Sequence, residues 1–201
     1  MGGGMGMPRF EAAEVGNLEL AWLIPLSLIG TVCGWLYFVS EHASEALAHA
    51  IGERPVVKAM LAGLALAICG TVLPYTMFAG ETQADVLMET YLTIPAGVLI
   101  ATGLVKAMLT PALINMGWRG GHFFPVIFSG VSLGYGLAIL TGADPVFCVA
   151  VCTASTMGAV MRQPVMVVGL LLMCFPLKGI VCMIIAAVIA AGIPLPKSLR
   201  K

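Results

Sequence analysis

The chain has 201 residues, of which 60% are hydrophobic and only 10% are charged, with equal numbers of basic and acidic side chains. Its mean hydropathy of +1.02 excludes a soluble domain and predicts several membrane-spanning helices. The formal net charge of zero gives no field that would attract nucleic acid. The six cysteines all lie in apolar runs without zinc-site spacing, so we expect no metal site and no cofactor.

The N-terminal part of the chain predicts a lead-in followed by a long helix. Residues 1–17 are rich in glycine, and we expect them to be disordered. Leu18 to Val39 is the first predicted span, and good helix formers continue the pattern to Ala50, before Gly52 and Pro55. Such a helix is about 50 Å long and exceeds the hydrocarbon thickness, so it must tilt or project.

The next part of the chain predicts three further helical segments. Val56 to Phe78 is a second span, and the acidic stretch from Ala79 to Asp85 is expected to be a loop. Pro95 then divides a long apolar region. We expect one helical segment near Leu87 to Ile94 and another near Ala96 to Ile114.

Lys106 lies inside the last of these segments. A cation within a membrane span is costly and normally faces a partner or water. Two interpretations are open: Lys106 raises the electrostatic potential along an anion path, or its long side chain reaches the membrane interface.

The stretch from Gly117 to Gly136 interrupts the apolar pattern and predicts a helix that starts inside the membrane. Gly121 lets the backbone bend, and Pro125 suits the first turn of a new helix. Lipid does not satisfy the free N–H groups of such a start, so residues such as His122 and Phe123 predict an anion site. The alternative is a glycine-kinked packing helix without a ligand.

Arg119 stands two residues before Gly121, beside Trp118. A fixed positive charge at this place would attract anions toward the predicted helix start. It would equally serve as an anchor at the membrane interface, and the sequence leaves both roles open.

Three more helical segments follow. Asp144 is a predicted N-cap for a segment over 146–160, and Pro164 starts a short span that ends near Cys174. An Ala- and Ile-rich span is predicted over 177–191. The tail, residues 195–201, is basic and is therefore expected to be cytoplasmic.

The pentapeptide at residues 121–125, GHFFP, resembles the GxFxP signature of the CLC family of chloride channels and chloride/proton antiporters. The similarity continues through Gly130 and Gly134 after Pro125. It also includes Arg-Gln-Pro at residues 162–164, which is similar to an Arg-Ala-Pro of that family. In the preceding helix the family often has a basic residue and a threonine, as Lys106 and Thr110 appear here.

The resemblance implies an all-α polytopic membrane protein with tilted and re-entrant helices. It covers residues 18–194 but corresponds only to the second of the family's two inverted repeats. In the family, the backbone amides at the positions of His122 and Phe123 contact the central anion. The anion-binding set implied here is Gly121, His122, Phe123 and Pro125.

The chain departs from the family in two ways. The GSGIP-like and GREGP-like segments of the first repeat, the second of which carries the gating glutamate, do not occur in it. Pro196 also stands where the family often has a tyrosine whose hydroxyl contacts the anion. The chain therefore looks like the C-terminal half of a CLC protein: a truncated gene product, a half-subunit or one piece of a split protein.

The function implied by the resemblance is a chloride channel or transporter module in the plasma membrane, which moves a halide through a site of helix N-terminal amides. The alternative is a non-conducting subunit with a structural or regulatory role. We see no catalytic set of residues and expect no enzyme activity. The expected partners are chloride or a similar anion, the lipid bilayer, and either a first-repeat CLC chain or further copies of this chain. In the family, the helices that match 164–174 and 177–191 contribute to a homodimer interface.

Overall fold

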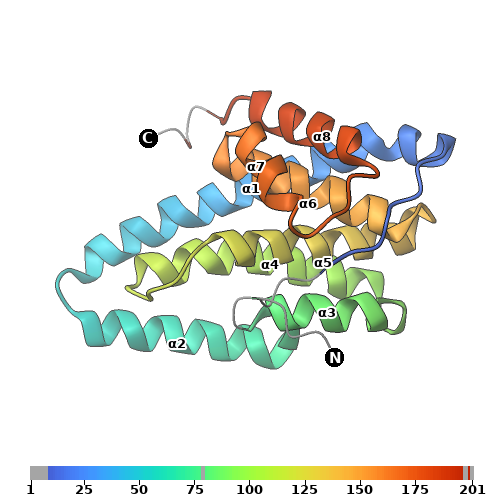
Figure 1. Ribbon diagram of the computed structural model, residues 1–201. Helices are drawn as coiled ribbons and strands as arrows, with labels where there is room; N and C mark the ends of the chain where they lie inside the picture. The colour runs from blue at the N-terminus through green and yellow to red at the C-terminus, as the bar shows by residue number, and fades with distance from the viewer. Residues whose placement is uncertain (1–8, 78–79, 197–198, 200–201) are drawn as a thin grey trace.

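The computed structural model describes residues 9–77, 80–196 and 199, and Figure 1 shows its arrangement. These residues contain helices and no strand, which confirms the predicted all-α fold. The α-helices are α1 (Asn17–Ile51), α2 (Pro55–Val72), α3 (Glu81–Thr90), α4 (Ala96–Asn115), α5 (Phe123–Thr141), α6 (Pro145–Met161), α7 (Pro164–Leu171) and α8 (Ile180–Gly192). Two short 3-10 helices, η1 (Pro74–Thr76) and η2 (Tyr91–Thr93), lie between α2 and α4.

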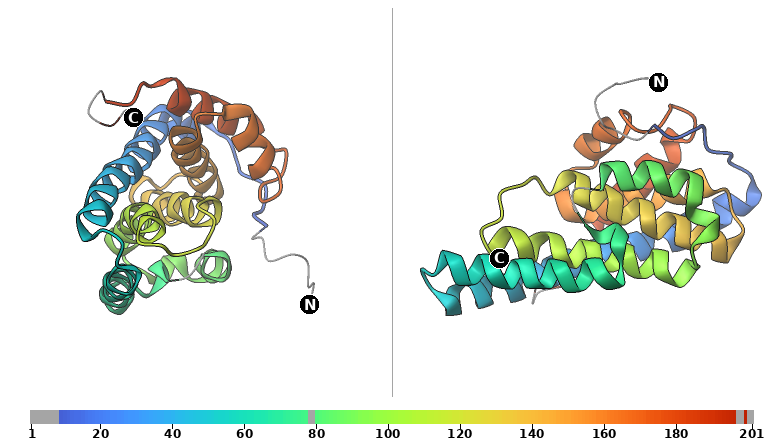
Figure 2. Two further views of the ribbon diagram at one scale, coloured as in Figure 1. Left: turned by 90° about the vertical axis from the view of Figure 1, so that its left-hand side faces the viewer. Right: turned by 90° about the horizontal axis from the view of Figure 1, so that it is seen from below.

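The helices α5 and α6 form the centre of the molecule. They pack on each other, α4 covers α5, and α1 packs on both α4 and α6. Figures 1 and 2 show α7 and α8 on one side of this centre and α2 and α3 on the opposite side. The central pair is therefore shielded on both sides, while α2 lies at the edge.

Small residues on α5 and α4 allow this close packing. A Cβ atom at Gly130 would overlap Thr153 of α6, and one at Gly134 would overlap Val149 of the same helix. A Cβ atom at Gly103 of α4 would lie 2.7 Å from the carbonyl oxygen of Ser129. The small residues of α5 thus let its neighbours approach its backbone closely.

Helix boundaries agree with the predictions at most glycine and proline positions. The long first helix ends at Ile51, before Gly52 with a φ of 68°, and Pro95 separates η2 from α4. Asp144 caps α6 as predicted, because its Oδ1 accepts a 2.7 Å hydrogen bond from the amide of Phe147. The last helix begins at Ile180, later than the predicted residue 177, because the left-handed Gly179 precedes it.

The prediction of a loop over residues 79–85 is wrong for residues 81–85. These residues form the first turns of α3. Ala84 and Leu87, three positions apart, are both buried, and α3 packs against α5. The polar composition suggested a loop, but glutamate, glutamine and alanine are good helix formers once one face of the helix is buried.

The described part of the N-terminal lead-in packs against the protein, although the sequence predicted disorder for residues 1–17. The ring of Phe10 stacks on that of Phe175 with 4.5 Å between centroids. The Phe10 amide donates a 2.9 Å hydrogen bond to the carbonyl of Cys174. Residues 1–8 of the lead-in lie outside the described residues, as do residues 197–198 and 200–201 of the predicted tail.

Candidate functional site

The connection between α4 and α5 is the predicted break in the apolar pattern. Helix α4 ends at Asn115, and α5 begins at Phe123, with His122 as its N-cap residue. Gly117 in the connection has a φ of 95°, a conformation that glycine adopts without strain. Pro125 lies in the first turn of α5 as predicted, where a backbone N–H would have no helical acceptor, so the N–H that proline lacks is not needed.

The start of α5 presents backbone donors that have no acceptor. The first hydrogen bond of the helix runs over 3.1 Å from the Val126 amide to the His122 carbonyl. The amides of His122 and Phe123 precede it and find no acceptor within the described part of the chain. Free amides and the positive end of a helix dipole together favour a bound anion.

A cavity of about 320 Å³ lies beside this helix start. Its walls come from α2, from α4, from the α4–α5 connection and from the first turn of α5. The lining residues are Leu66, Lys106, Leu109, Thr110, Leu113, Ile114, Trp118, Arg119, Gly120, Gly121 and Pro125. Two of these side chains are cationic, and none of the described lining residues is acidic, so the cavity has a positive potential.

Four of the six predicted site residues therefore meet at one cavity: Lys106, Arg119, Gly121 and Pro125. His122 and Phe123 follow directly in sequence but are not among its lining residues. Their rings stack with 4.5 Å between centroids, and the His122 ring lies 6.5 Å from that of Tyr37 on α1. These two side chains thus lie beside α1 and not in the cavity wall.

Lys106 is buried within the protein, with 4% of its surface exposed. Its Nζ donates a 2.7 Å hydrogen bond to the carbonyl oxygen of Thr76 in η1. Thr110, one turn later on α4, donates through Oγ1 to the Lys106 carbonyl over 2.8 Å. Lys106 consequently contributes charge inside the protein and does not extend to its surface.

Two contributors to this region were missed from the sequence. Thr76 supplies the carbonyl that binds Lys106, and Leu66 of α2 closes one side of the cavity. The contribution of Thr76 could have been expected from Pro74. A proline after a helix interrupts the hydrogen-bond ladder and leaves nearby carbonyl groups without helical partners. Nothing in the sequence around Leu66 distinguishes it from its apolar neighbours.

This arrangement suits the binding of a small anion by amides and fixed positive charge. Among the described residues, no group of three potential metal ligands occurs. The described lining residues hold two cations and a threonine hydroxyl but no carboxylate or histidine that would act as a general base. The chemistry offered is therefore electrostatic.

Comparison with known proteins relates this geometry to a family. The family described as voltage-gated chloride channel matches residues 4–194. No curated protein matches the chain. The crystal structure of a CLC-type fluoride/proton antiporter has the same fold, with a TM-score of 0.75 at 20% sequence identity. The match covers 93% of this chain and 47% of the antiporter, so the chain spans about half the length of that relative.

The helices agree with the properties of such a family. Four of them, α1, α2, α4 and α5, are long and apolar enough to cross a membrane. The chain is an integral membrane protein, and members of the matched family are channels or transporters and not enzymes. Since the family match extends over nearly the whole chain, the protein belongs to the voltage-gated chloride channel family.

Proposed function

We propose that this chain is one half of a halide channel or transporter in the plasma membrane, and that the start of α5 binds the anion. The observation that carries the proposal is the pair of amides, on His122 and Phe123, that lack an acceptor in the described chain. They lie next to a cavity that contains Lys106 and Arg119. The amides replace part of the hydration shell of the halide, while the two cations make its approach favourable.

The complete pathway requires a second half. At the edge of the site, Gly120 and Gly121 are exposed, and a Cβ atom at either would meet no atom of the described chain within 4 Å. Exposed amides are poorly satisfied in lipid, so a partner must cover this face. We propose a first-repeat chain as that partner, and a further copy of this chain bound through the exposed apolar side chains of α7 and α8, such as Val165 and Val181.

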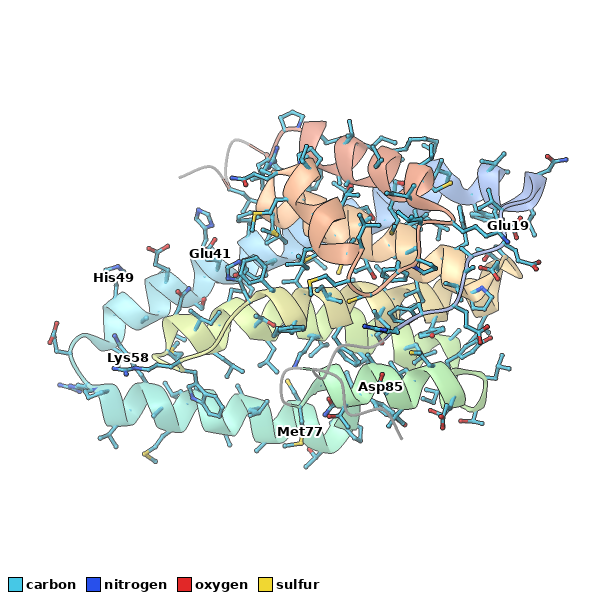
Figure 3. All side chains as sticks on the ribbon, in the orientation of Figure 1. Glu19, Glu41, His49, Lys58, Met77 and Asp85 are labelled. Atoms are coloured by element: carbon cyan, nitrogen blue, oxygen red, sulfur yellow. The ribbon has the colours of Figure 1, made fainter. Side chains whose placement is uncertain are left out.

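The distribution of basic residues supports a cytoplasmic C-terminus. Arg54, Lys58, Arg119 and Arg162 lie toward the end of the molecule where α1, α4 and α6 finish. Figure 3 shows Lys58 and His49 at this end and Glu19 at the other. Near Glu19, Lys178 lines a cavity with three carboxylates. Lysine and arginine favour the cytoplasmic side, which supports a cytoplasmic orientation for this end of the protein.

A second candidate is a non-conducting structural or regulatory subunit. It is favoured by Pro196, which supplies no hydroxyl where the resembled family often has a tyrosine. Halide efflux from vesicles separates the two candidates. A chain that never conducts, alone or with a co-expressed first repeat, is the subunit, and chloride-selective efflux in the presence of the first repeat identifies the transport module.

The anion site itself is tested by replacing Phe123 with proline. Phe123 is the first residue of α5, where proline is tolerated, and the change removes one of the two free N–H groups. We expect halide efflux from vesicles with a co-expressed first repeat to fall about tenfold or more, as for loss of a hydrogen bond to a charged group. The matched control is Phe123→Ala, which removes the same ring but keeps the amide. Equal efflux from both variants, with unchanged unfolding temperatures, would rule out the amide as an anion ligand.

A further inference from the structure

Arg162 lies at a second polar position, remote in sequence from the start of α5. It is the C-cap of α6 and has a φ of 58°, the left-handed conformation that is unusual for a residue with a Cβ atom. One of its terminal nitrogens, Nη1, donates a 3.1 Å hydrogen bond to the Ala191 carbonyl near the end of α8. Its other two nitrogens, Nε and Nη2, are buried and have no partner within the described chain.

The two unpartnered nitrogens define the kind of ligand that would satisfy them. Nε–H and one Nη2–H lie parallel on one edge of a guanidinium group. That edge forms two hydrogen bonds at once with two oxygens of a carboxylate or a phosphate. Buried donors without an acceptor are unfavourable, so the geometry indicates a two-oxygen anion at Arg162.

The pocket at Arg162 combines this charge with apolar walls. It has a volume of about 500 Å³ and is lined by Phe38, Glu41, His42, Val160, Arg162, Leu195 and Leu199. Glu41, its one acidic lining residue in the described chain, has an interaction of its own and is not an unpaired charge. A free inorganic anion would gain nothing from contact with the four apolar side chains. A ligand with an anionic head and a hydrocarbon part would contact both Arg162 and these side chains.

The level of the pocket along α1 favours a lipid as that ligand. The apolar stretch from Leu18 to Val39 is about 33 Å long as a helix, close to the thickness of a bilayer core. Glu41 and His42 follow after Ser40 and line the pocket. The pocket therefore lies just past the apolar part of α1, where its polar residues begin. Basic pockets between membrane helices on the cytoplasmic side are suited to anionic headgroups.

We propose that Arg162 binds the headgroup phosphate of an anionic phospholipid, whose hydrocarbon part lies against Phe38, Val160, Leu195 and Leu199. Since both free nitrogens are buried, the pocket wall must open for the phosphate to reach them. The wall formed by Leu195 is suited to this movement, because residues 193–196 form no helix. This site requires only that the chain is in a membrane, so it stands or falls independently of halide transport.

The test is thermal unfolding of the full chain in mild detergent, titrated with phosphatidylglycerol, phosphatidylcholine or inorganic phosphate. We expect phosphatidylglycerol to raise the unfolding temperature at concentrations where the other two have no effect. In Arg162→Gln, the phosphatidylglycerol concentration at half of the full shift should rise about tenfold, because a charge-assisted hydrogen bond is lost. The control Arg54→Gln removes an exposed arginine that does not line the pocket and should leave the titration unchanged.

Four results would overturn the proposal. Equal shifts with phosphatidylcholine would mean that headgroup charge is not recognised, and equal shifts with inorganic phosphate would indicate a free-anion site. An unchanged titration in Arg162→Gln would remove the arginine from the site. Because Arg162 also binds the Ala191 carbonyl, a second variant, Leu199→Asp, puts a negative charge on the pocket wall outside the helices α1 to α8. It should unfold at the wild-type temperature without lipid and lose the phosphatidylglycerol shift; a retained shift would contradict the proposal.

Discussion

Helices α2 and α5 have the same mean hydropathy, 1.8, and opposite surroundings. In the most apolar 18 residues of α5, 78% of the residues are buried inside the protein, whereas in those of α2 only 6% are buried. Hydropathy thus predicts that a helix has apolar neighbours but not whether those neighbours are protein or lipid. The small residues of α5 decide the question, because they let α4 and α6 approach its backbone.

The exposed side of α2 is a regular apolar stripe. Val56, Met60, Leu64, Ile68 and Val72 follow one another at intervals of four residues, and each is more than half exposed. Residues at this spacing lie along one face of a helix. Gly63 of the same helix has open space where a Cβ atom would be. A large side chain on α2 therefore has room that a side chain on the central face of α5 lacks.

The largest expected effect comes from Gly130→Leu on α5. Its Cβ would overlap the backbone of Thr153, and neither α5 nor α6 can move without disturbing the helices packed on them. Ordinary overpacking costs about 1–3 kcal/mol, and a clash with backbone should exceed this range and prevent folding. Gel filtration in detergent should show loss of the monodisperse peak.

The matched control is Gly63→Leu on α2, whose Cβ would have no atom of the described chain within 4 Å. It should fold normally, because leucine is also a better helix former than glycine. If both variants fold, the close α5–α6 contact is not required. If neither folds, α2 is covered by a partner, and its difference from α5 disappears.

The sequence was sufficient to predict features that depend on local chemistry. Pro95 and Pro125 marked helix boundaries, Asp144 marked an N-cap, and the glycines before His122 marked the break between α4 and α5. Each is decided by the backbone of a few neighbouring residues. The GHFFP motif placed the candidate site at this break because it combines these same local signals.

Features built from distant segments were not predicted. The contact between Lys106 and the Thr76 carbonyl joins residues 30 positions apart, and the cavity also needs Leu66 from α2. The first turns of α3, residues 81–85, were predicted as a loop because burial of Ala84 and Leu87 against α5, a tertiary effect, outweighs the polar composition. The unpartnered donors of Arg162 likewise depend on how α6 and α8 pack.

An intermediate effect is expected for Lys106→Glu, because Lys106 lines the cavity between exposed α2 and buried α5. The variant leaves the Thr76 carbonyl without its donor and sets a carboxylate against it. A buried group left unsatisfied costs about 1–3 kcal/mol, and reversal of the charge should also reduce halide efflux. Lys58→Glu, at the start of α2, is the control and should change neither quantity much. Wild-type efflux and unfolding temperature for Lys106→Glu would show that Lys106 has no electrostatic role.

The smallest effect is expected for Leu64→Ala, in the apolar stripe of α2. Leu64 is 58% exposed, so its truncation creates no internal cavity, and surface changes of this kind cost about 0.5 kcal/mol or less. Leu133→Ala on α5 is the matched change at a side chain that is 1% exposed, and core truncations of leucine cost about 2–5 kcal/mol. Thermal unfolding of both variants in the same detergent measures the difference. A loss at Leu64 as large as that at Leu133 would mean that the stripe is buried against another chain. Light scattering of the wild-type protein would then reveal an oligomer, and the Leu64 variant should shift it toward the monomer.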